Sequence, residues 1–201
     1  MRHTLILRVA AAVLGVNALQ AQATFHLWQF DQVFTNATGT QQYIEMYSGF
    51  AGQGFLNDGF FPPAPAHLKS DASDFAFPHD LNTIVHDTNN QHLLIATAGF
   101  NPGGLIPDYT IPAHFFTAGG TLDFTDSATP TSDVLNSINL ASLPTSGSLA
   151  LFQVPGTISQ STGAPSPNSF TGQTAPEPAT LGIMGLGMLA LRRRKRGPAG
   201  S

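Results

Sequence analysis

The chain alternates between hydrophobic and polar residues at a period of two near the start of its middle part. Residues 25–34 read FHLWQFDQVF, with Leu27 and Val33 expected on one side of an extended strand. The opposite side is expected to carry Trp28, Phe30 and Phe34. Because the side chains of a strand point alternately to its two faces, this pattern predicts a central β-strand.

A second alternating segment follows after a short polar interval. Residues 41–47 read QQYIEMY. Its two faces are expected to carry Tyr43, Glu45 and Tyr47 on one side and Gln42, Ile44 and Met46 on the other. The NATGT sequence at 36–40 supplies the Asn and Gly residues that favour a turn. Together the two segments predict a β-hairpin.

Three further segments are typical of strands: HLLIATA at 92–98, GTLDFTD at 120–126 and SLALFQV at 148–154. Between the two ends of the chain, no stretch of twelve residues keeps a helical period. The pattern therefore predicts a mostly β domain over residues 24–156, an antiparallel immunoglobulin-like sandwich of Greek-key type. We expect this domain to be flanked by an N-terminal signal helix and a short C-terminal membrane helix.

The first 23 residues have the composition of a signal peptide. Arg2 and Arg8 give a positive start, residues 9–16 are apolar, and Ala21 and Ala23 form a small-x-small cleavage site. We expect signal peptidase to remove this segment from an exported chain. The alternative is a short buried helix.

Residues 157–175 consist largely of Ser, Thr, Gly, Pro and Asn. The bulky apolar residues among them are Ile158 and Phe170. This composition is typical of flexible linkers and predicts a stalk between the domain and the C-terminal segment.

The apolar run at 179–191 has thirteen residues and is followed by a basic cluster. As a helix the run rises about 20 Å, whereas a bilayer's hydrocarbon core is about 30 Å thick. It therefore predicts a marginal membrane span, which local thinning or snorkelling basic stems make possible. The basic cluster is expected to stay on the cytoplasmic side, leaving the domain outside. It consists of Arg192, Arg193, Arg194, Lys195 and Arg196.

Pro176, Glu177 and Pro178 stand directly before the apolar run. The order of a Pro-Glu-Pro tripeptide, a Gly- and Leu-rich segment and an Arg-rich end resembles the PEP-CTERM sorting signal of exported proteins in Gram-negative bacteria. The resemblance covers residues 176–201, with GPAGS as an extension beyond the basic cluster. It implies that an exosortase, an integral-membrane transpeptidase-like enzyme, recognises and cleaves the tail. The alternative is a plain tail anchor without processing.

Charge is distributed unevenly along the 201 residues, whose formal net charge is −4. Residues 24–175 contain eleven acids against the single base Lys69, a formal charge of −10. Because nucleic-acid binding requires clustered Lys and Arg, this balance argues against a nucleic-acid partner. The chain has no cysteine, so no disulfide supports the fold.

The middle of the chain also resembles an uncharacterised family of exported bacterial proteins. The segments that carry the resemblance are FDQVFTNATGTQQYIEMY, LLIATAGFNPGG, PDYTIPAHFF, GGTLDF and SPNSFTGQT. The opening hairpin of that family is similar to the lamin-tail domain, which implies an immunoglobulin-like sandwich with a binding or surface role. Gln32 departs from the family, which commonly has an acid at this position. The resemblance supplies no functional residues.

Common catalytic and phosphate-binding motifs are absent from the sequence, and the histidines and acids form two candidate metal clusters. His79, His86 and His92 alternate with acids, as zinc sites do, but their spacing fits solvated loop ends better. Asp123, Asp126 and Asp133 are candidates for a weak calcium site, with solubilising surface charge as the alternative. We expect no other metal and no cofactor.

Glu45 and two phenylalanine pairs are further candidates for catalysis or binding. Glu45 between two tyrosines is a poor catalytic acid by itself, and no carboxylate pair for a glycosidase can be assigned. The pairs Phe60-Phe61 and Phe115-Phe116 suit either an exposed aromatic patch or the core, and the core is favoured.

These observations predict an exported, non-enzymatic protein with a structural, adhesive or binding role in the cell envelope or extracellular matrix. It would be sorted at the outer face of the cytoplasmic membrane and then reach the surface, with extracellular polysaccharide as a candidate partner. That role is implied by the association of exosortase systems with exopolysaccharide production, because a fold alone does not define function. The alternatives are a secreted polysaccharide-acting hydrolase and a calcium-dependent carbohydrate-binding module.

Overall fold

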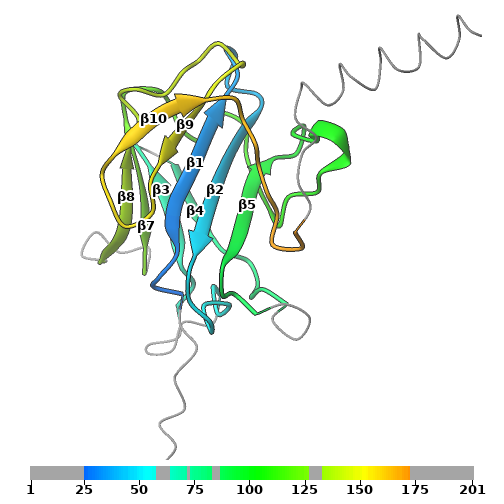
Figure 1. Cartoon of the computed structure of the whole chain (residues 1–201), viewed down its shortest axis with the longest axis vertical. Coiled ribbons are helices and arrows are strands. Elements are labelled where there is room, and N and C mark those ends of the chain that lie inside the picture. Colours follow the sequence, from blue (N-terminus) through cyan, green and yellow to red (C-terminus); the bar gives the residue numbers. More distant parts are fainter. Residues whose placement is uncertain (1–24, 58–63, 72, 83–86, 127–132, 173–201) are drawn as a thin grey trace, which may run out of the picture.

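The computed structural model describes residues 25–57, 64–71, 73–82, 87–126 and 133–172. Over these ranges the chain forms ten β-strands and one short 3₁₀ helix, η1 at Pro102–Gly104. The strands make two sheets that pack face to face (Figure 1). None of the described segments forms a helix long and apolar enough to span a membrane.

The larger sheet has six strands in the order β10-β9-β1-β2-β5-β6. Its neighbours pair antiparallel, except that β5 and β6 are parallel. The strands are β1 at Gln29–Thr35, β2 at Gln42–Ser48, β5 at Gln91–Thr97, β6 at Tyr109–Ile111, β9 at Ala150–Gln153 and β10 at Gln160–Gly163.

The smaller sheet has four antiparallel strands in the order β4-β3-β7-β8. They are β3 at His67–Ser70, β4 at Ser73–Ala76, β7 at Thr121–Thr125 and β8 at Val134–Asn139.

The prediction of a mostly β, two-sheet sandwich is confirmed. The segments 92–98, 120–126 and 148–154 correspond to β5, β7 and β9. The prediction of purely antiparallel pairing is wrong at one place, the parallel β5–β6 pair. The predicted signal helix and membrane helix lie outside the described residues.

The predicted hairpin is confirmed as β1 and β2. Its turn is closed by a hydrogen bond from the Asn36 N–H to the Gln41 carbonyl at 2.9 Å. The side-chain oxygen of Asn36 also accepts from the Gln41 N–H at 3.2 Å. Gly39 adopts φ +69°, a left-handed conformation that glycine reaches without steric cost.

A β-bulge interrupts the β1–β2 register between Phe30 and Gln32. Its extra residue is Asp31, which reverses the alternation of faces for the rest of the strand. Phe30 and Val33 therefore both belong to the core between the sheets, and Phe34 lies in a separate cluster. The predicted grouping of Phe34 with Phe30, opposite Val33, was wrong because a bulge leaves no mark on a simple alternating pattern.

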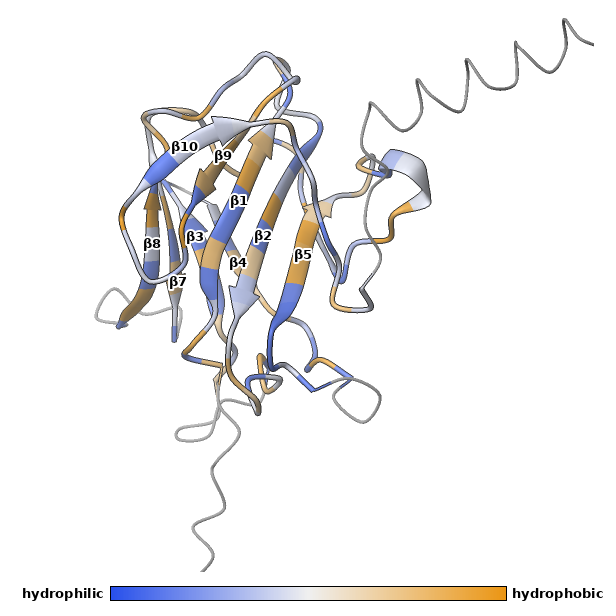
Figure 2. Cartoon of the chain, in the orientation of Figure 1, coloured by the Kyte–Doolittle hydropathy of each residue, from blue (hydrophilic) through white to orange (hydrophobic). Residues whose placement is uncertain are grey.

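The main core lies between the two sheets, and apolar residues alternate with polar ones along β1 and β2 (Figure 2). Phe115 and Phe116 are each 2% exposed, which confirms the core interpretation for this pair. Phe60 and Phe61 lie outside the described residues. The largest buried side chains are Trp28, Tyr43, Phe30, Phe77, Phe115 and Phe124.

A second, smaller apolar cluster lies on the face of the large sheet that points away from the main core. It joins β1, β2 and β5 with the loop that contains η1, through Phe34, Tyr43, Leu94, Ala96, Phe100, Leu105 and Ala150. Phe34 and Tyr43 stack with ring centroids 5.3 Å apart. This outer face of the sheet is therefore partly covered, and it carries the buried polar residues described below.

The described part of the segment predicted to be a flexible linker, residues 157–172, belongs to the folded domain. Residues 160–163 form β10, which pairs with β9. Residues 164–172, here called the strap, run from β10 across the outer face of the large sheet towards β5 (Figure 1). Ser169 is 1% exposed and Phe170 4% exposed. The linker prediction was wrong for this part because its small polar residues bond to polar groups of the sheet, a partner that composition alone does not reveal.

Candidate functional site

Three ionisable side chains from three adjacent strands meet on the outer face of the large sheet. Asp31 comes from the bulge in β1, Glu45 from the middle of β2 and His92 from the start of β5. In the register His92 pairs with Tyr47, two residues beyond Glu45 on the same face. The bulge turns Asp31 towards the other two, as bulges commonly re-aim a side chain.

The atoms of this cluster are in close contact. Nδ1 of His92 lies 2.6 Å from Oε1 of Glu45 and 3.6 Å from Oδ2 of Asp31. Among the described residues this is the set of three metal-ligating side chains whose ligand atoms all lie within 4.8 Å of one another. One imidazole and two carboxylates are therefore available to a single bound ion or proton.

Glu45 is 0% exposed, and both of its carboxylate oxygens are occupied. Oε2 accepts from the backbone N–H of Asn168 at 3.0 Å and from Nε2 of Gln32 at 3.3 Å. Oε1 accepts from Nδ2 of Asn168 at 3.0 Å and contacts His92. A buried charge is tolerated only when it is paired and hydrogen-bonded, and Glu45 satisfies both conditions.

Gln32 connects the cluster to the strap. Its Nε2 donates to Glu45 and to the carbonyl and hydroxyl of Ser166, each at 3.3 Å. Its Oε1 accepts from the Ser166 N–H at 3.0 Å and from the Tyr43 hydroxyl. An amide has both donors and acceptors, so a single residue satisfies a buried tyrosine, a buried carboxylate and the strap.

The electrostatic environment shifts the pKa values of three groups in the cluster. Burial raises the pKa of Asp31 from 3.8 to about 6, and Glu45 adds to the rise while His92 opposes it. Burial by itself lowers the pKa of His92, but its contacts with Glu45 and Asp31 outweigh burial and raise it above 6.5. Burial, followed by the charges of Glu45 and Asp31, raises the pKa of Tyr43 well above its ordinary value.

A second buried carboxylate holds the end of the strap. Oδ2 of Asp108 accepts from the backbone N–H of Leu94 and from that of Phe170, both at 2.8 Å. Burial raises the pKa of Asp108, although these backbone hydrogen bonds act against the rise. Asp108 thus joins the strap to β5 at the edge of the sheet.

Alternate residues of the strap bond to successive parts of the sheet. Ser166 bonds to Gln32 on β1, Asn168 bonds to Glu45 on β2, and Phe170 bonds to Asp108 beside β5 and β6. The strap therefore crosses the strands in extended form and covers Glu45. A 0% exposed carboxylate beneath it is closed to a large substrate, so the arrangement suits structural or ion-binding chemistry.

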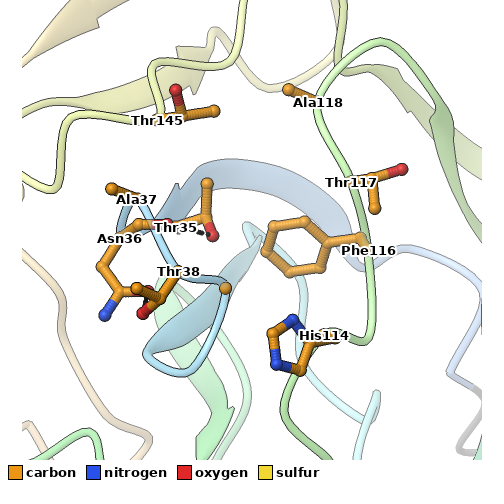
Figure 3. Close-up of a pocket in the computed structure, with 10 residues that line it drawn as sticks. Thr35, Asn36, Ala37, Thr38, His114, Phe116, Thr117, Ala118 and Thr145 are labelled. Atoms are coloured by element: carbon orange, nitrogen blue, oxygen red, sulfur yellow. Dashed lines mark hydrogen bonds between the residues drawn. The ribbon is translucent and has the colours of Figure 1, made fainter.

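A separate small hollow lies at the turn of the β1–β2 hairpin (Figure 3). Its volume is about 200 Å³. It is lined by Thr35, Asn36, Ala37, Thr38, Gly39, His114, Phe116, Thr117, Ala118 and Thr145. The lining combines the hydroxyl and amide groups of four threonines and one asparagine with apolar residues and one histidine, and it contains no carboxylate. Such a surface can hydrogen-bond a small polar ligand, but it has no acid and base pair for hydrolysis.

Of the two described histidines among the zinc candidates, one joins the cluster. His92 does so, whereas His79 is exposed and stacks on Tyr109, with ring centroids 4.8 Å apart. His86 lies outside the described residues. His79 and His92 thus do not converge with each other, and the partners of His92 are carboxylates from β1 and β2.

The calcium candidates lie on β7 and around the loop that follows it. Asp123 accepts from the Ser137 hydroxyl at 2.6 Å, and Asp126 accepts from the Asp133 N–H at 3.0 Å. Asp123, Asp126 and Asp133 do not form a ligand group within the described residues. The loop at 127–132 lies outside them, and a calcium site there stays a prediction.

Asp31 and Glu45 were not recognised as partners of His92 from the sequence. Glu45 is separated from His92 by 47 positions of the numbering, and the bulge that aims Asp31 has no sequence signal here. The available signal was an acid at a strand-centre position between two tyrosines. A charged residue in the middle of a predicted central strand requires a partner, and this requirement points to a buried polar site.

The fold and the order of segments define a class of protein, a two-sheet β-sandwich followed by a C-terminal targeting segment. Residues 174–196 match the family model described as the PEP-CTERM protein-sorting motif. The match includes Pro176, Glu177, Pro178 and the basic cluster, all of which lie outside the described residues. The motif supports export and sorting by an exosortase at the membrane.

The search of curated proteins found none similar to the chain, and the search of solved structures found none either. The family model covers the tail alone. The resemblance of the middle domain to an uncharacterised exported family therefore stays a prediction.

Proposed function

We propose that the protein is a non-enzymatic component of the cell envelope or extracellular matrix, delivered there by exosortase-dependent processing of its tail. The observation that carries the proposal is the sorting motif at 174–196. Its final location is the cell surface or the extracellular matrix, and its role there is structural, adhesive or binding.

The relation between the domain and the motif supports this delivery route. The strap is bonded to the sheet as far as Phe170, and only Gln173 separates Gly172 from the matched segment. An exosortase would therefore meet the motif close to a folded domain, and the cleaved product would keep the sandwich intact.

Two features support a non-enzymatic role. Among the described residues, the cluster of Asp31, Glu45 and His92 contains Glu45, which is fully buried and already holds the strap. The hollow at the hairpin turn is lined by hydroxyl and amide groups that can bond to sugar hydroxyls. Extracellular polysaccharide is accordingly the ligand class that we propose for a binding role.

Mass spectrometry of both termini tests the sorting proposal. The full chain is expressed in a host with an exosortase and in the same host without one. With the enzyme, we expect the surface protein to begin at Thr24 and to lack the sequence RRRKRGPAGS. A variant with Pro176, Glu177 and Pro178 replaced by Ala is the control and should keep its tail. An intact tail on the surface protein in the exosortase host would refute the proposal.

A further inference from the structure

The ligand atoms of Asp31, Glu45 and His92 face one small volume on the outer side of the large sheet. One ligand atom from each lies within 4.8 Å of the other two. Bonds from zinc to nitrogen and oxygen ligands are about 2.0–2.2 Å long, which places neighbouring ligand atoms about 3 Å apart. Small side-chain movements would bring the three groups to that spacing.

Nδ1 of His92 is a buried polar atom without a well-directed hydrogen bond. Its distance of 2.6 Å from Oε1 of Glu45 suits a hydrogen bond, but the direction does not. Buried nitrogen atoms almost always have a well-directed partner, and Nδ1 has the Glu45 carboxylate beside it without that direction. An ion placed between Nδ1 and the carboxylates would satisfy this lone pair and both acids together.

Charge at the site also favours a cation. Asp31 and Glu45 place two carboxylates within 4.8 Å of each other beside a single imidazole, and two ionised carboxylates at this spacing repel each other. Lys69 is the one Lys or Arg in residues 25–172, and it belongs to β3 in the other sheet. A positive charge between the two carboxylates therefore has to come from His92 or from a bound ion.

We propose that Asp31, Glu45 and His92 form a binding site for a divalent transition-metal ion of the zinc or manganese type. An imidazole with two carboxylates suits these ions, whereas calcium prefers oxygen ligands alone. The side chains of His92 and Asp31 are 31% and 23% exposed, so an ion can enter from solvent while Glu45 forms the floor. The alternative is that protonated His92 alone neutralises the pair.

Binding at this site would also strengthen the hold on the strap. Glu45 accepts hydrogen bonds from Asn168 and Gln32, and these bonds fix the orientation of its carboxylate. In known metal sites, residues that do not touch the metal orient its ligands in the same way. An ion on Oε1 would therefore stabilise the fold that covers Glu45. The proposal is independent of how the tail is processed.

The experiment uses the full chain without an affinity tag, in detergent and freed of metal with EDTA. ZnCl₂, MnCl₂ and CaCl₂ are titrated separately by calorimetry, and the melting temperature is measured with each ion. We expect one zinc or manganese ion per chain. At a hundredfold excess over Kd, the melting temperature should rise by about 5–10 °C and return with EDTA.

Two single variants test the ligands, and a third serves as the control. His92→Gln and Asp31→Asn should each weaken binding by about 100-fold or more, because each removes a direct ligand and the loss of an outer-shell partner alone costs about 10- to 100-fold. The matched control is His67→Gln. Nδ1 of His67 lies 2.6 Å from Oδ1 of Asp74, so this variant removes a similar histidine that faces one carboxylate. It should bind zinc as the parent does.

Circular dichroism first confirms that each variant is folded, and Asp31→Asn decides the test if His92→Gln does not fold. Equal zinc affinity in the parent and the folded ligand variant would mean adventitious binding to other histidines and would overturn the proposal. An unchanged melting temperature with zinc and manganese would do the same. Stabilisation by calcium alone would contradict the assigned class of ion.

Discussion

Glu45 holds Asn168 through two hydrogen bonds of 3.0 Å, one from the backbone N–H to Oε2 and one from Nδ2 to Oε1. The two residues are 123 positions apart in the sequence. Hydrogen bonds to an ionised carboxylate are about twice as strong as those between neutral groups. The attachment of the strap to β2 therefore depends largely on this single pair, while Gln32 attaches it to β1.

Replacing Asn168 with Ala is expected to lower the free energy of unfolding by about 1–3 kcal/mol, because one of the buried acceptors of Glu45 loses its partner. Urea denaturation of the full chain in detergent measures this loss. Limited proteolysis should also cut the strap faster in the variant, since its middle contact is weakened.

The matched control is Asn101→Ala. Asn101 is exposed and makes no side-chain cap bond at η1. Its replacement should change the free energy of unfolding by no more than about 0.5 kcal/mol. Equal losses in the two variants would show that the Glu45–Asn168 pair contributes little.

Gln32→Glu places a second carboxylate 3.3 Å from the buried Glu45. At pH 7 this variant should be less stable by about 2–4 kcal/mol, because a hydrogen bond becomes a repulsion between buried like charges. Near pH 4 the new carboxyl binds a proton and can donate to Glu45 as the amide does, so much of the loss should be recovered. Urea denaturation at the two pH values measures the difference.

The control for that experiment is Gln29→Glu, which adds the same charge at the half-buried start of β1. Its effect should be small and should change little with pH. A Gln32→Glu protein as stable as the parent at pH 7 would contradict the expected repulsion between buried like charges.

Asp108→Asn tests how burial changes the pKa of Asp108, the carboxylate that holds the end of the strap. Burial raises the native pKa of Asp108 above 3.8, so the folded protein holds this proton more tightly than the unfolded chain does. The contribution of Asp108 to stability is therefore greatest below pH 3.8 and is lost as pH rises towards the native pKa. Asn keeps an acceptor for the Leu94 and Phe170 N–H groups but does not ionise.

We accordingly expect the stability of Asp108→Asn, relative to the parent, to improve as pH rises from 3 to 7. Chemical denaturation at several pH values measures this relative stability. A difference that stays constant across the range would contradict the inferred shift of the Asp108 pKa.

Gly39→Ala should destabilise the hairpin for two separate reasons. Gly39 has φ +69°, and a Cβ built there lies 2.7 Å from Nδ1 of His114. Gly172 has a similar φ of +74° with no atom within 4 Å of its Cβ position. Gly172→Ala therefore measures the cost of the left-handed backbone conformation without a steric clash. We expect about 1 kcal/mol for Gly172→Ala and about 2–3 kcal/mol for Gly39→Ala in thermal denaturation. Equal losses would show that the His114 ring moves aside freely.

The parts of the fold that could be predicted from sequence are those with a period of two or with an apolar run between turn residues. The hairpin of β1 and β2 has the period, and β5, β7 and β9 are such runs. The strands β3, β4, β6 and β10 have four residues or fewer, and β8 has polar residues at three of its six positions. Short or polar strands are defined by their neighbours in the sheet, and a local pattern does not record those neighbours.

The candidate site could be predicted only in fragments. Glu45 was expected on the face opposite Ile44 and Met46, and that expectation is confirmed by the core. The bulge at Asp31 and the strap could not be predicted. The strap has the Ser, Pro and Gly content of a linker, and it is ordered because Glu45 and Asp108 supply acceptors for its N–H groups.

The position of the strap directly before the sorting motif has a consequence for the timing of folding. A ribosome makes residues 166–170 more than a hundred residues after Gln32 and Glu45, so a growing chain leaves the Glu45 carboxylate in water until the final part of the domain exists. The sandwich is closed by the residues that immediately precede the sorting motif. A chain that presents a complete motif therefore already contains the strap that closes the sandwich, whereas a chain interrupted before residue 166 lacks both.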